Sequence, residues 1–582
     1  MNPTFASLRR GSVAAAAMTA LALTALASAA HAQSATLALI NGHVVTVDSA
    51  NPEAEAVAIA GDRIIAVGTN EEIRRHIGAS TRVMDVGGRL VIPGFIEGHG
   101  HLLDLGDAKR KVDLTTARTW DDIVARIAAA GRAMPRGTWI VGYGWHQEKW
   151  DRAPSPSVEG YPVHASLSAA VPDHPVLLEH ASGHASFVNA AALRLAGITN
   201  ATRDPSGGEI VRDAAGAPTG LLRELASDLA SSALARSRAG RTRAQREAEL
   251  RQLVELAGAD ALSKGVTSFH DAGASFEQID VFRKMADERR LPLRLYPMVR
   301  FESMARMDSL LGRYRMTGHA GGFLTVRAIK RQVDGALGSH GAWLLEPYAD
   351  LPRSTGLALE QPASLERVAA LAVKHGYQLA THAIGDRANR EVLDVYEKAL
   401  RGRAAGDAPR WRIEHAQHVA PADVARFARL GVIASMQGIH TISDAPWIPA
   451  KLGPERAERE SYLFRSLRDA GVTVTNGTDA PVEDVNPIPS FYGMVARVAK
   501  DGRVFVPSQR LTRAEALRAY TLDNAYASFQ ERELGSLAAG KYADVVVMSK
   551  DIMRIPESEI PTAQVDYTIV AGTVRYRREA TP

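Results

Sequence analysis

Between residues 91 and 524, apolar stretches of strand length alternate with longer stretches that have helical spacing. This alternation is typical of βα units around a parallel sheet. We predict eight strands, the number that a (β/α)₈ TIM barrel requires, and therefore an α/β fold. The predicted strands cover residues 91–97, 266–270, 293–299, 325–333, 378–382, 411–415, 432–437 and 473–478.

The two ends of the chain have a different pattern, with short strands separated by turns. Asn41-Gly42 and Ala571-Gly572 each stand between two such strands and are typical hairpin signals. We expect residues 33–90 and 525–582 to form one small β-sandwich domain together. The barrel then occupies residues 91–524. Its segment from about 103 to 255 is too long for one βα connection, and we expect an insertion there that walls or covers the active site.

The first 32 residues have the composition of an export signal. Arg9-Arg10 precedes an apolar run over 13–27, and Ala30-His31-Ala32 matches a small-x-small cleavage site. The run is shorter than the roughly 20 residues that cross a bilayer. We expect a signal peptide and a periplasmic or secreted protein with no stable membrane span after cleavage. An uncleaved anchor is the less favoured alternative.

Charge and cysteine content narrow the chemistry. The net charge of +4 is small for 582 residues and the chain has no block of Lys and Arg, so nucleic acid is not an expected partner. The chain has no cysteine, which excludes a disulfide framework, thiol nucleophiles and cysteine zinc sites. Any metal ligands must come from His, Asp, Glu or modified Lys side chains.

Ionisable residues stand at the ends of several predicted strands. In a barrel these ends open into one mouth, so residues far apart in sequence meet there. His99 and His101 are two apart on an extended chain and can face the same side. Alone, each residue has an ordinary structural explanation, and it is their common position at strand ends that favours a metal site. The ionisable residues at these strand ends are His99, His101, His270, Lys330, His382, His415 and Asp479.

Six segments also resemble a known family. Residues 91–101 (VIPGFIEGHGH) resemble the opening motif of the amidohydrolase superfamily. Residues 330–339 (KRQVDGALGS), 381–388 (THAIGDRA), 412–417 (RIEHAQ) and 476–482 (NGTDAPV) resemble the amidohydrolase family 3 branch. That branch contains the YtcJ-like proteins and N-substituted formamide deformylase. Residues 535–545 (GSLAAGKYADV) are similar to the segment with which the family returns to its small β-domain.

The resemblance implies a cage for divalent metal, Zn²⁺ first, with two ions favoured over one. His99 and His101 would bind the more buried ion and His382 and His415 the second. Lys330 would bridge them as a carbamate, and Asp479 would touch the first ion and the water. The chain departs from the family pattern at Glu97-Gly98, where Asp-Ser is common, and at His146, where an acid often follows the Trp. The second departure leaves substrate preference open.

These residues predict hydrolysis of a carbon–nitrogen bond in a small non-peptide amide by a metal-bound hydroxide. Asp479 is the expected base, and it would pass the proton to the leaving nitrogen. His184, Trp145 and His270 are candidate substrate contacts. A metal-dependent esterase or lactonase would use the same residues. A deaminase and a catalytically inactive periplasmic binding protein on the same scaffold are less favoured alternatives. Oligomeric state is left open, with a homodimer considered.

Overall fold

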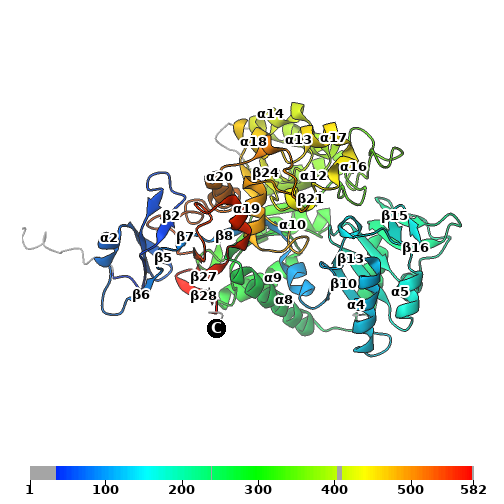
Figure 1. Ribbon diagram of the computed structural model, residues 1–582, viewed down its shortest axis with the longest axis horizontal. Coiled ribbons are helices and arrows are strands. Elements are labelled where there is room, and N and C mark those ends of the chain that lie inside the picture. The colour runs from blue at the N-terminus through cyan, green and yellow to red at the C-terminus, as the bar shows by residue number, and fades with distance from the viewer. Residues whose placement is uncertain (1–33, 238, 403–408, 580–582) are drawn as a thin grey trace, which may run out of the picture.

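The computed structural model describes residues 34–237, 239–402 and 409–579 (Figure 1). The predicted signal peptide lies outside the described residues. Within them, no helix has both the length and the hydropathy that a membrane crossing needs.

A nearly closed barrel of eight parallel strands forms the centre of the molecule and confirms the predicted α/β TIM barrel. The strands pair in chain order, each with the next. They are β8 (Phe95–Gly100), β17 (Val266–Ala274), β18 (Arg294–Val299), β21 (Ala328–Gln332), β22 (Gln378–Ala383), β23 (Arg412–His415), β24 (Ile433–Met436) and β25 (Val474–Asn476).

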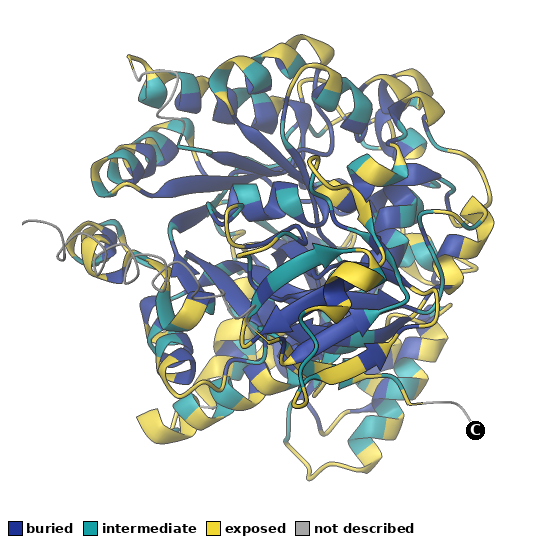
Figure 2. Ribbon diagram, turned by 90° about the vertical axis from the view of Figure 1, so that its left-hand side faces the viewer, coloured by how far each residue is buried: buried dark blue, intermediate teal, exposed yellow. Residues whose placement is uncertain are grey.

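Helices surround the barrel, and Figure 2 shows buried strands inside a ring of helices whose outer faces are exposed. These helices begin and end at residues that are typical of helix caps. Helix α14 (Pro421–Leu430) begins with proline and ends at Gly431, which adopts the left-handed conformation (φ 64°) that favours glycine. Other helices of the ring include α8 (Arg243–Ser263), α9 (Phe276–Asp287), α10 (Met304–Tyr314), α12 (Pro362–His375), α13 (Asp386–Leu400), α18 (Phe464–Asp469) and α20 (Arg513–Ala519).

The barrel closes between its first and last strands through side-chain and loop contacts. Asn524, in helix α21 (Leu522–Ala527), donates its side-chain amide to the carbonyls of Ile96 (2.7 Å) and Asn476 (2.8 Å). A Cβ atom at Gly98 would lie 2.4 Å from the Asn476 carbonyl oxygen, so this close approach requires glycine. Glu97 accepts hydrogen bonds from the backbone (2.7 Å) and the hydroxyl (3.1 Å) of Thr478. Glu97 and Gly98 therefore stabilise the contact between the first and last barrel strands, which we call the closing seam.

The first predicted strand, 91–97, proves to be two strands. Strand β7 (Leu90–Pro93) belongs to a terminal sheet, and the barrel strand β8 begins at Phe95. Gly94 separates them, and its backbone N–H is bonded to the carbonyl of Asp544 from the other end of the chain. The chain thus passes from the terminal sheet to the barrel at Gly94. The predicted strand 325–333 is also divided, into β20 (Leu324–Val326) and β21.

The two chain ends together form two sheets beside the barrel. One has the order β5-β4-β1-β6 and the other β28-β27-β26-β7-β2-β3, so the second contains strands from both ends. In β26 (Val545–Met548), Val545 and Val547 pack between the two sheets, whereas Val546 and Met548 join the barrel core. Alternating side chains of one strand thus connect the sandwich to the barrel. The remaining strands are β1 (Leu37–Ile40), β2 (His43–Val45), β3 (Glu53–Ala54), β4 (Ala56–Ala60), β5 (Arg63–Gly68), β6 (Arg82–Asp85), β27 (Val565–Val570) and β28 (Thr573–Arg577).

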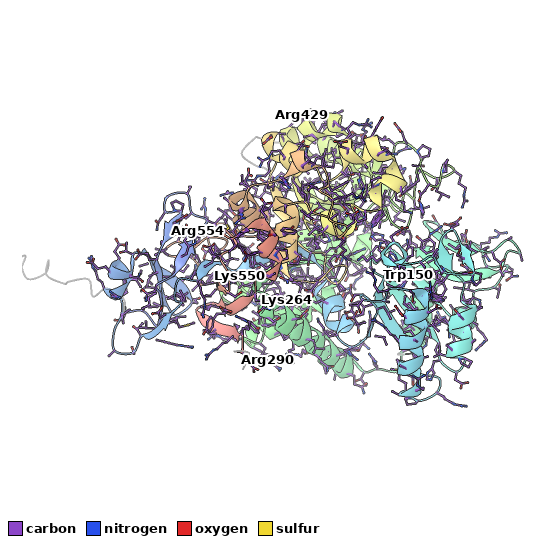
Figure 3. All side chains as sticks on the ribbon, viewed as in Figure 1. Trp150, Lys264, Arg290, Arg429, Lys550 and Arg554 are labelled. Atoms are coloured by element: carbon purple, nitrogen blue, oxygen red, sulfur yellow. The ribbon has the colours of Figure 1, made fainter. Side chains whose placement is uncertain are left out.

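The segment between β8 and β17 carries a separate six-stranded sheet, which lies at the far end of the molecule from the terminal sheets (Figure 1). It has its own hydrophobic core, in which the rings of Trp145 and Trp150 stack at 6.0 Å; Figure 3 labels Trp150 there. Helix α8, after this sheet, packs against β17 and belongs to the barrel. In sheet order the strands are β15 (Gly208–Arg212), β16 (Pro218–Glu224), β14 (Ala185–Val188), β13 (Val176–His180), β10 (Ile140–Trp145) and β9 (Val112–Asp113).

Candidate metal centre

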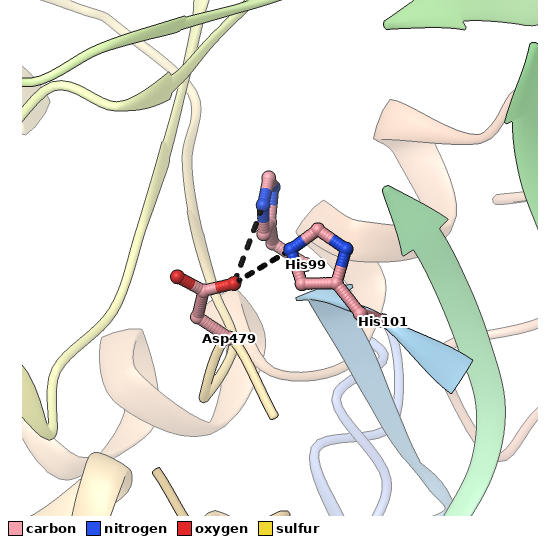
Figure 4. Close-up of side chains that lie close together, drawn as sticks. All are labelled: His99, His101 and Asp479. Carbon is pink, nitrogen blue, oxygen red and sulfur yellow. Dashed lines mark ion pairs between the residues drawn. The ribbon is translucent and has the colours of Figure 1, made fainter. Parts of the chain in front are cut away.

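Three of the predicted ligands form a compact group where β8 and β25 end. The nearest ligand atoms of His99, His101 and Asp479 all lie within 4.8 Å of one another. Asp479 Oδ1 is 3.3 Å from His101 Nε2 and 3.6 Å from His99 Nε2 (Figure 4). The backbone supports this arrangement, because the Asp479 N–H donates to the His99 carbonyl at 2.8 Å.

The other three predicted ligands border this group. Lys330, on β21, places Nζ 3.3 Å from His99 Nε2. The His415 ring lies 4.6 Å from that of His99, and its Nδ1 is 3.9 Å from Asp479 Oδ2. The His382 ring, on β22, is 4.4 Å from that of His415. The structure therefore brings all six predicted ligands to one end of the barrel.

Two of these residues adopt unusual backbone conformations. His415 has φ 75° and Asp479 has φ 60°, in the left-handed region that non-glycine residues rarely occupy. Such conformations cost on the order of 1–3 kcal/mol and persist where the surrounding structure enforces them, often at functional sites. At His415, the turn ends the regular alternation of β23 next to the metal centre.

A buried Arg–Glu pair supports His99 from inside the barrel. Glu414 accepts a hydrogen bond from His99 Nδ1, and its Oε1 is 2.6 Å from Arg412 Nε. Arg412 also donates to the Gly98 carbonyl at 2.7 Å, and both side chains are fully buried. This support was not predicted. The sequence did contain a signal for it. Arg412 and Glu414 are two residues apart, so their side chains lie on the same face of a strand that ends at a candidate ligand.

The two outer histidines differ in their surroundings. His415 Nδ1 is 2.9 Å from Gln437 Oε1 on the next strand end. Such an outer partner sets the orientation and tautomer of a metal-binding imidazole. His382 Nε2 lies 3.5 Å from Asp334 Oδ1 but forms no hydrogen bond with it. Asp334 is instead held by the backbone N–H groups of Ile384 and Gly385, at 3.0 and 2.8 Å.

Burial and neighbouring charges shift the protonation of the group toward metal-binding forms. Burial lowers the pKa of His99 to about 4 and that of Lys330 to about 7. Burial alone would raise the pKa of Asp479, but the adjacent His101 side chain and the charges of the nearby imidazoles hold it well below its usual range. At neutral pH the group thus offers unprotonated imidazole and a carboxylate.

The donor set and two unbonded atoms fit a divalent ion. Asp479 Oδ1 and His382 Nε2 are buried and have no hydrogen-bond partner among the described residues. Imidazole nitrogens with a carboxylate oxygen are the donors that Zn²⁺ and related ions prefer. Because buried polar atoms are normally satisfied, these two atoms indicate a missing electrophilic partner.

The centre lies between two cavities that share His184, His382, His415 and Asp479. The smaller is walled partly by His146 of the insertion. The wider one has a volume of about 680 Å³ and runs along the insertion toward β18 and β21. His184, one of the candidate substrate contacts, is thus at the junction of the cavities, with its Nδ1 2.9 Å from Glu224 Oε2.

The other two candidate substrate contacts lie elsewhere. Trp145 is fully buried in the core of the insertion, and its indole N–H donates to the Leu178 carbonyl at 3.0 Å. The adjacent residue, His146, lines the smaller cavity instead. His270 is fully buried inside the barrel, with Nδ1 3.1 Å from Arg412, and lines neither cavity. The structure therefore places neither side chain at a cavity wall, because sequence position does not reveal which way a side chain faces.

The chain is similar to known proteins over most of its length. A family model described as "Amidohydrolase family" matches residues 82–576. The chain is 34% identical to the Arabidopsis thaliana protein LONG AFTER FAR-RED 3, over 88% of this chain and 87% of that protein. It is 32% identical to N-substituted formamide deformylase of Arthrobacter pascens, over 94% and 99%. A crystal structure of an uncharacterized metal-dependent hydrolase from Pyrococcus furiosus superposes with a TM-score of 0.68 at 27% identity, covering 89% of this chain and all of that one.

Proposed function

This chain belongs to the amidohydrolase family and is a hydrolase with a divalent metal site, and we propose that it cleaves carbon–nitrogen bonds of small non-peptide amides. The observation that carries the proposal is the convergence of His99, His101 and Asp479 with three further potential ligands at one barrel mouth. The likeness to a formamide deformylase over nearly the full chain favours an amide over an ester.

When bound, a divalent ion would polarise the substrate carbonyl and make a water molecule more acidic. His99, His101, His382, His415 and Asp479 are the residues that would hold it, with Zn²⁺ the first ion to test. This assignment is supported by the unprotonated imidazole nitrogens and the carboxylate, which lie together at the mouth of the barrel.

Asp479 has the properties of the general base. Its carboxylate is deprotonated, and its Oδ1 has no hydrogen-bond partner within the described residues. The carboxylate would accept the proton of the attacking water and deliver it to the leaving nitrogen, so that a free amine departs. His184 would bind the substrate oxygen. Burial alone would lower the pKa of His184, but Glu224 raises it, which favours the protonated, donating form.

Lys330 is proposed to carry a carbamate. Its Nζ would attack carbon dioxide, forming an N–C bond and releasing one proton to solvent, which gives an anion with two oxygens. The side chain is 2% exposed, and no carboxylate oxygen of a described residue lies within 4.0 Å of Nζ. A buried amine without an anionic partner is unfavourable, and a carbamate would make this position a metal ligand.

We also propose that the enzyme acts outside the cytoplasm, on the strength of the N-terminal pattern alone. Cleavage after Ala30-His31-Ala32 would leave a mature chain that begins at Gln33. N-terminal sequencing of protein recovered from the periplasm or medium tests this. Recovery of full-length chain in the cytoplasmic or membrane fraction would contradict it.

The proposed activity can be tested with enzyme loaded with Zn²⁺ and a panel of N-formyl and N-acetyl amines beside the matched esters. We expect amide hydrolysis that chelator removes and Zn²⁺ restores. D479N should lose about 10²–10⁴-fold in kcat, the usual contribution of a general base, while keeping its fold. D121N, at an exposed insertion position, is the control. Hydrolysis of esters alone would refute the carbon–nitrogen assignment.

A further inference from the structure

One cation of the wider cavity has no ion-pair partner. Arg300 follows directly after β18, at the mouth of the barrel, and lines the cavity together with Lys330 and Asp479. Its guanidinium donates to Gln332 Oε1 at 2.6 Å. No carboxylate oxygen of a described residue lies within 4.0 Å of it.

The other basic side chains at the cavity wall are differently placed. Arg331 forms two hydrogen bonds with Glu360, at 2.8 and 2.5 Å. Lys111 lies 2.7 Å from both Asp107 and Glu179. Lys330 belongs to the metal centre. Arg300 is therefore the guanidinium at this wall whose charge is available to a ligand.

The position of Arg300 is fixed before any ligand arrives. A guanidinium has five N–H donors, and Gln332 uses one, which leaves enough for a bidentate contact. Gln332 is itself held, because its amide nitrogen lies 3.3 Å from the Asp334 carbonyl. A Cβ atom at Gly273 would lie 2.6 Å from Arg300 Cδ, so the glycine makes room for the arginine stem.

Apolar surface adjoins this cation. Phe301 borders the cavity and is 70% exposed, and the Arg300 guanidinium carbon lies 4.9 Å from the centre of its ring. Phe301 also has φ 65°, an unusual conformation for an aromatic residue. Leu225, from the insertion, is 41% exposed at the same cavity. Exposed apolar side chains beside a charged group are typical of a binding surface.

Carboxylates are present at the cavity wall as well. Asp104 and Asp228 both lie more than 4.0 Å from the Arg300 nitrogens. Asp271 accepts the Leu102 N–H at 3.0 Å, and it too lies more than 4.0 Å from the Arg300 nitrogens. None of them neutralises Arg300 by direct contact.

We propose that Arg300, oriented by Gln332 and flanked by Phe301, binds a carboxylate of the substrate, so that the preferred substrates are amides carrying a carboxylate next to an apolar group. The predicted substrate preference in catalysis rests on the proposed amide hydrolysis. The predicted binding of a carboxylate by Arg300 does not depend on it. The carboxylate–guanidinium pair would orient the long part of the substrate along the wider cavity, with the amide at the metal centre.

The kinetic test compares two substrates that differ only in the carboxylate, N-formylphenylalanine and N-formylphenethylamine. We expect the wild-type enzyme to prefer the former. R300M should lower kcat/KM for it by about 10- to 100-fold, the range for a lost charge-assisted hydrogen bond, and leave the neutral substrate within about threefold. R429M, at an exposed position of α14 labelled in Figure 3, should change neither.

Equal loss on both substrates would overturn the subsite and place Arg300 at the reaction centre. Equal wild-type rates on both substrates would also overturn it, while leaving amide hydrolysis intact. R300K, which keeps the charge but not the planar fork, should show an intermediate loss and provides a second variant if R300M folds poorly.

A binding measurement separates the subsite from the reaction. Calorimetry with 3-phenylpropanoate and 3-phenylpropanol on the metal-loaded protein should show tighter binding of the carboxylate, lost in R300M but kept in R429M. A carboxylate bound to the metal would instead bind R300M as well as wild type, which would refute the proposal. If no amide is hydrolysed but this preference holds, the proposed function fails and the subsite stands.

Discussion

Glu414 binds Nδ1 of His99 inside the barrel, and this bond directs the opposite ring nitrogen, Nε2, toward Asp479 at 3.6 Å. The carboxylate is in turn fixed by Arg412, with Oε1 2.6 Å from its Nε. The hydrogen bond makes Nδ1 the donor and leaves Nε2 as a lone-pair donor to a metal. The orientation of one ligand thus depends on two residues that would not touch the ion.

E414Q should therefore weaken metal binding without removing a ligand. The loss of an outer carboxylate partner typically reduces metal affinity by about 10- to 100-fold. Competition with a chelator, read as metal equivalents per chain, measures the effect. E366Q, at a half-exposed position of α12, is the matched control and should bind metal like wild type. Unchanged metal affinity in E414Q would show that Glu414 stabilises the barrel without contributing to metal binding through His99.

K330M should remove the proposed bridge between two ions. The variant keeps the stem of the side chain but cannot form a carbamate, so we expect it to hold one metal equivalent fewer than wild type and to lose hydrolytic activity. A metal-loaded crystal structure of wild type should show carboxylate density on Nζ. An unmodified Lys330 in a fully active, metal-loaded enzyme would contradict the bridged arrangement.

N524A should destabilise the barrel at its closing seam. The substitution leaves the carbonyls of Ile96 and Asn476 without their donor, and each unpaired buried group costs about 1–3 kcal/mol. We expect a loss of about 2–4 kcal/mol in the free energy of unfolding, measured with urea. N200A, in an exposed loop of the insertion, should change little. Equal stability of the two variants would mean that other contacts close the seam.

Acid should weaken the attachment of α20. The hydrogen bond with Arg465 is the main cause that lowers the pKa of Glu515 to about 2 from 4.5. Since the folded pKa is depressed, this contribution is present above about pH 4.5 and is lost as the pH falls from 4.5 toward 2.

For this partly exposed pair we expect at most about 1 kcal/mol after solvent screening. The unfolding free energies of wild type and E515Q should therefore differ at pH 7 and converge near pH 2. A difference that stays constant across this range would contradict the ion-pair explanation.

The hydrophobic pattern was sufficient to predict the barrel, because apolar segments of strand length alternate with stretches of helical spacing between residues 91 and 524. It failed at 91–97, where the apolar run continues across two strands. In the local sequence, only Pro93 and Gly94 mark the break between the two strands. Asp544, whose carbonyl accepts the Gly94 N–H at this break, is 450 residues away along the chain. Such a boundary depends on long-range pairing, which local pattern does not contain.

The candidate site shows the same limit. Residues at strand ends were predictable, since topology alone sends those ends to one mouth. The direction in which Trp145 and His270 face was not, because it depends on packing against distant residues. Arg300 was missed because a single arginine after a strand is unremarkable until its neighbours are known to leave it unpaired.

The pairing of β7 with β26 has a consequence for the order in which the protein can mature. Val91 lies opposite Val547, so this ladder cannot form until nearly the whole chain has been synthesised. Strand β8, which carries His99, follows β7 after a single residue. The attachment of β8 to the terminal sheet, through β7, must therefore wait for the last strands, although its pairing with β17 does not. A nascent or truncated chain would lack this attachment, and protection of the β7 backbone amides from exchange should come late in refolding.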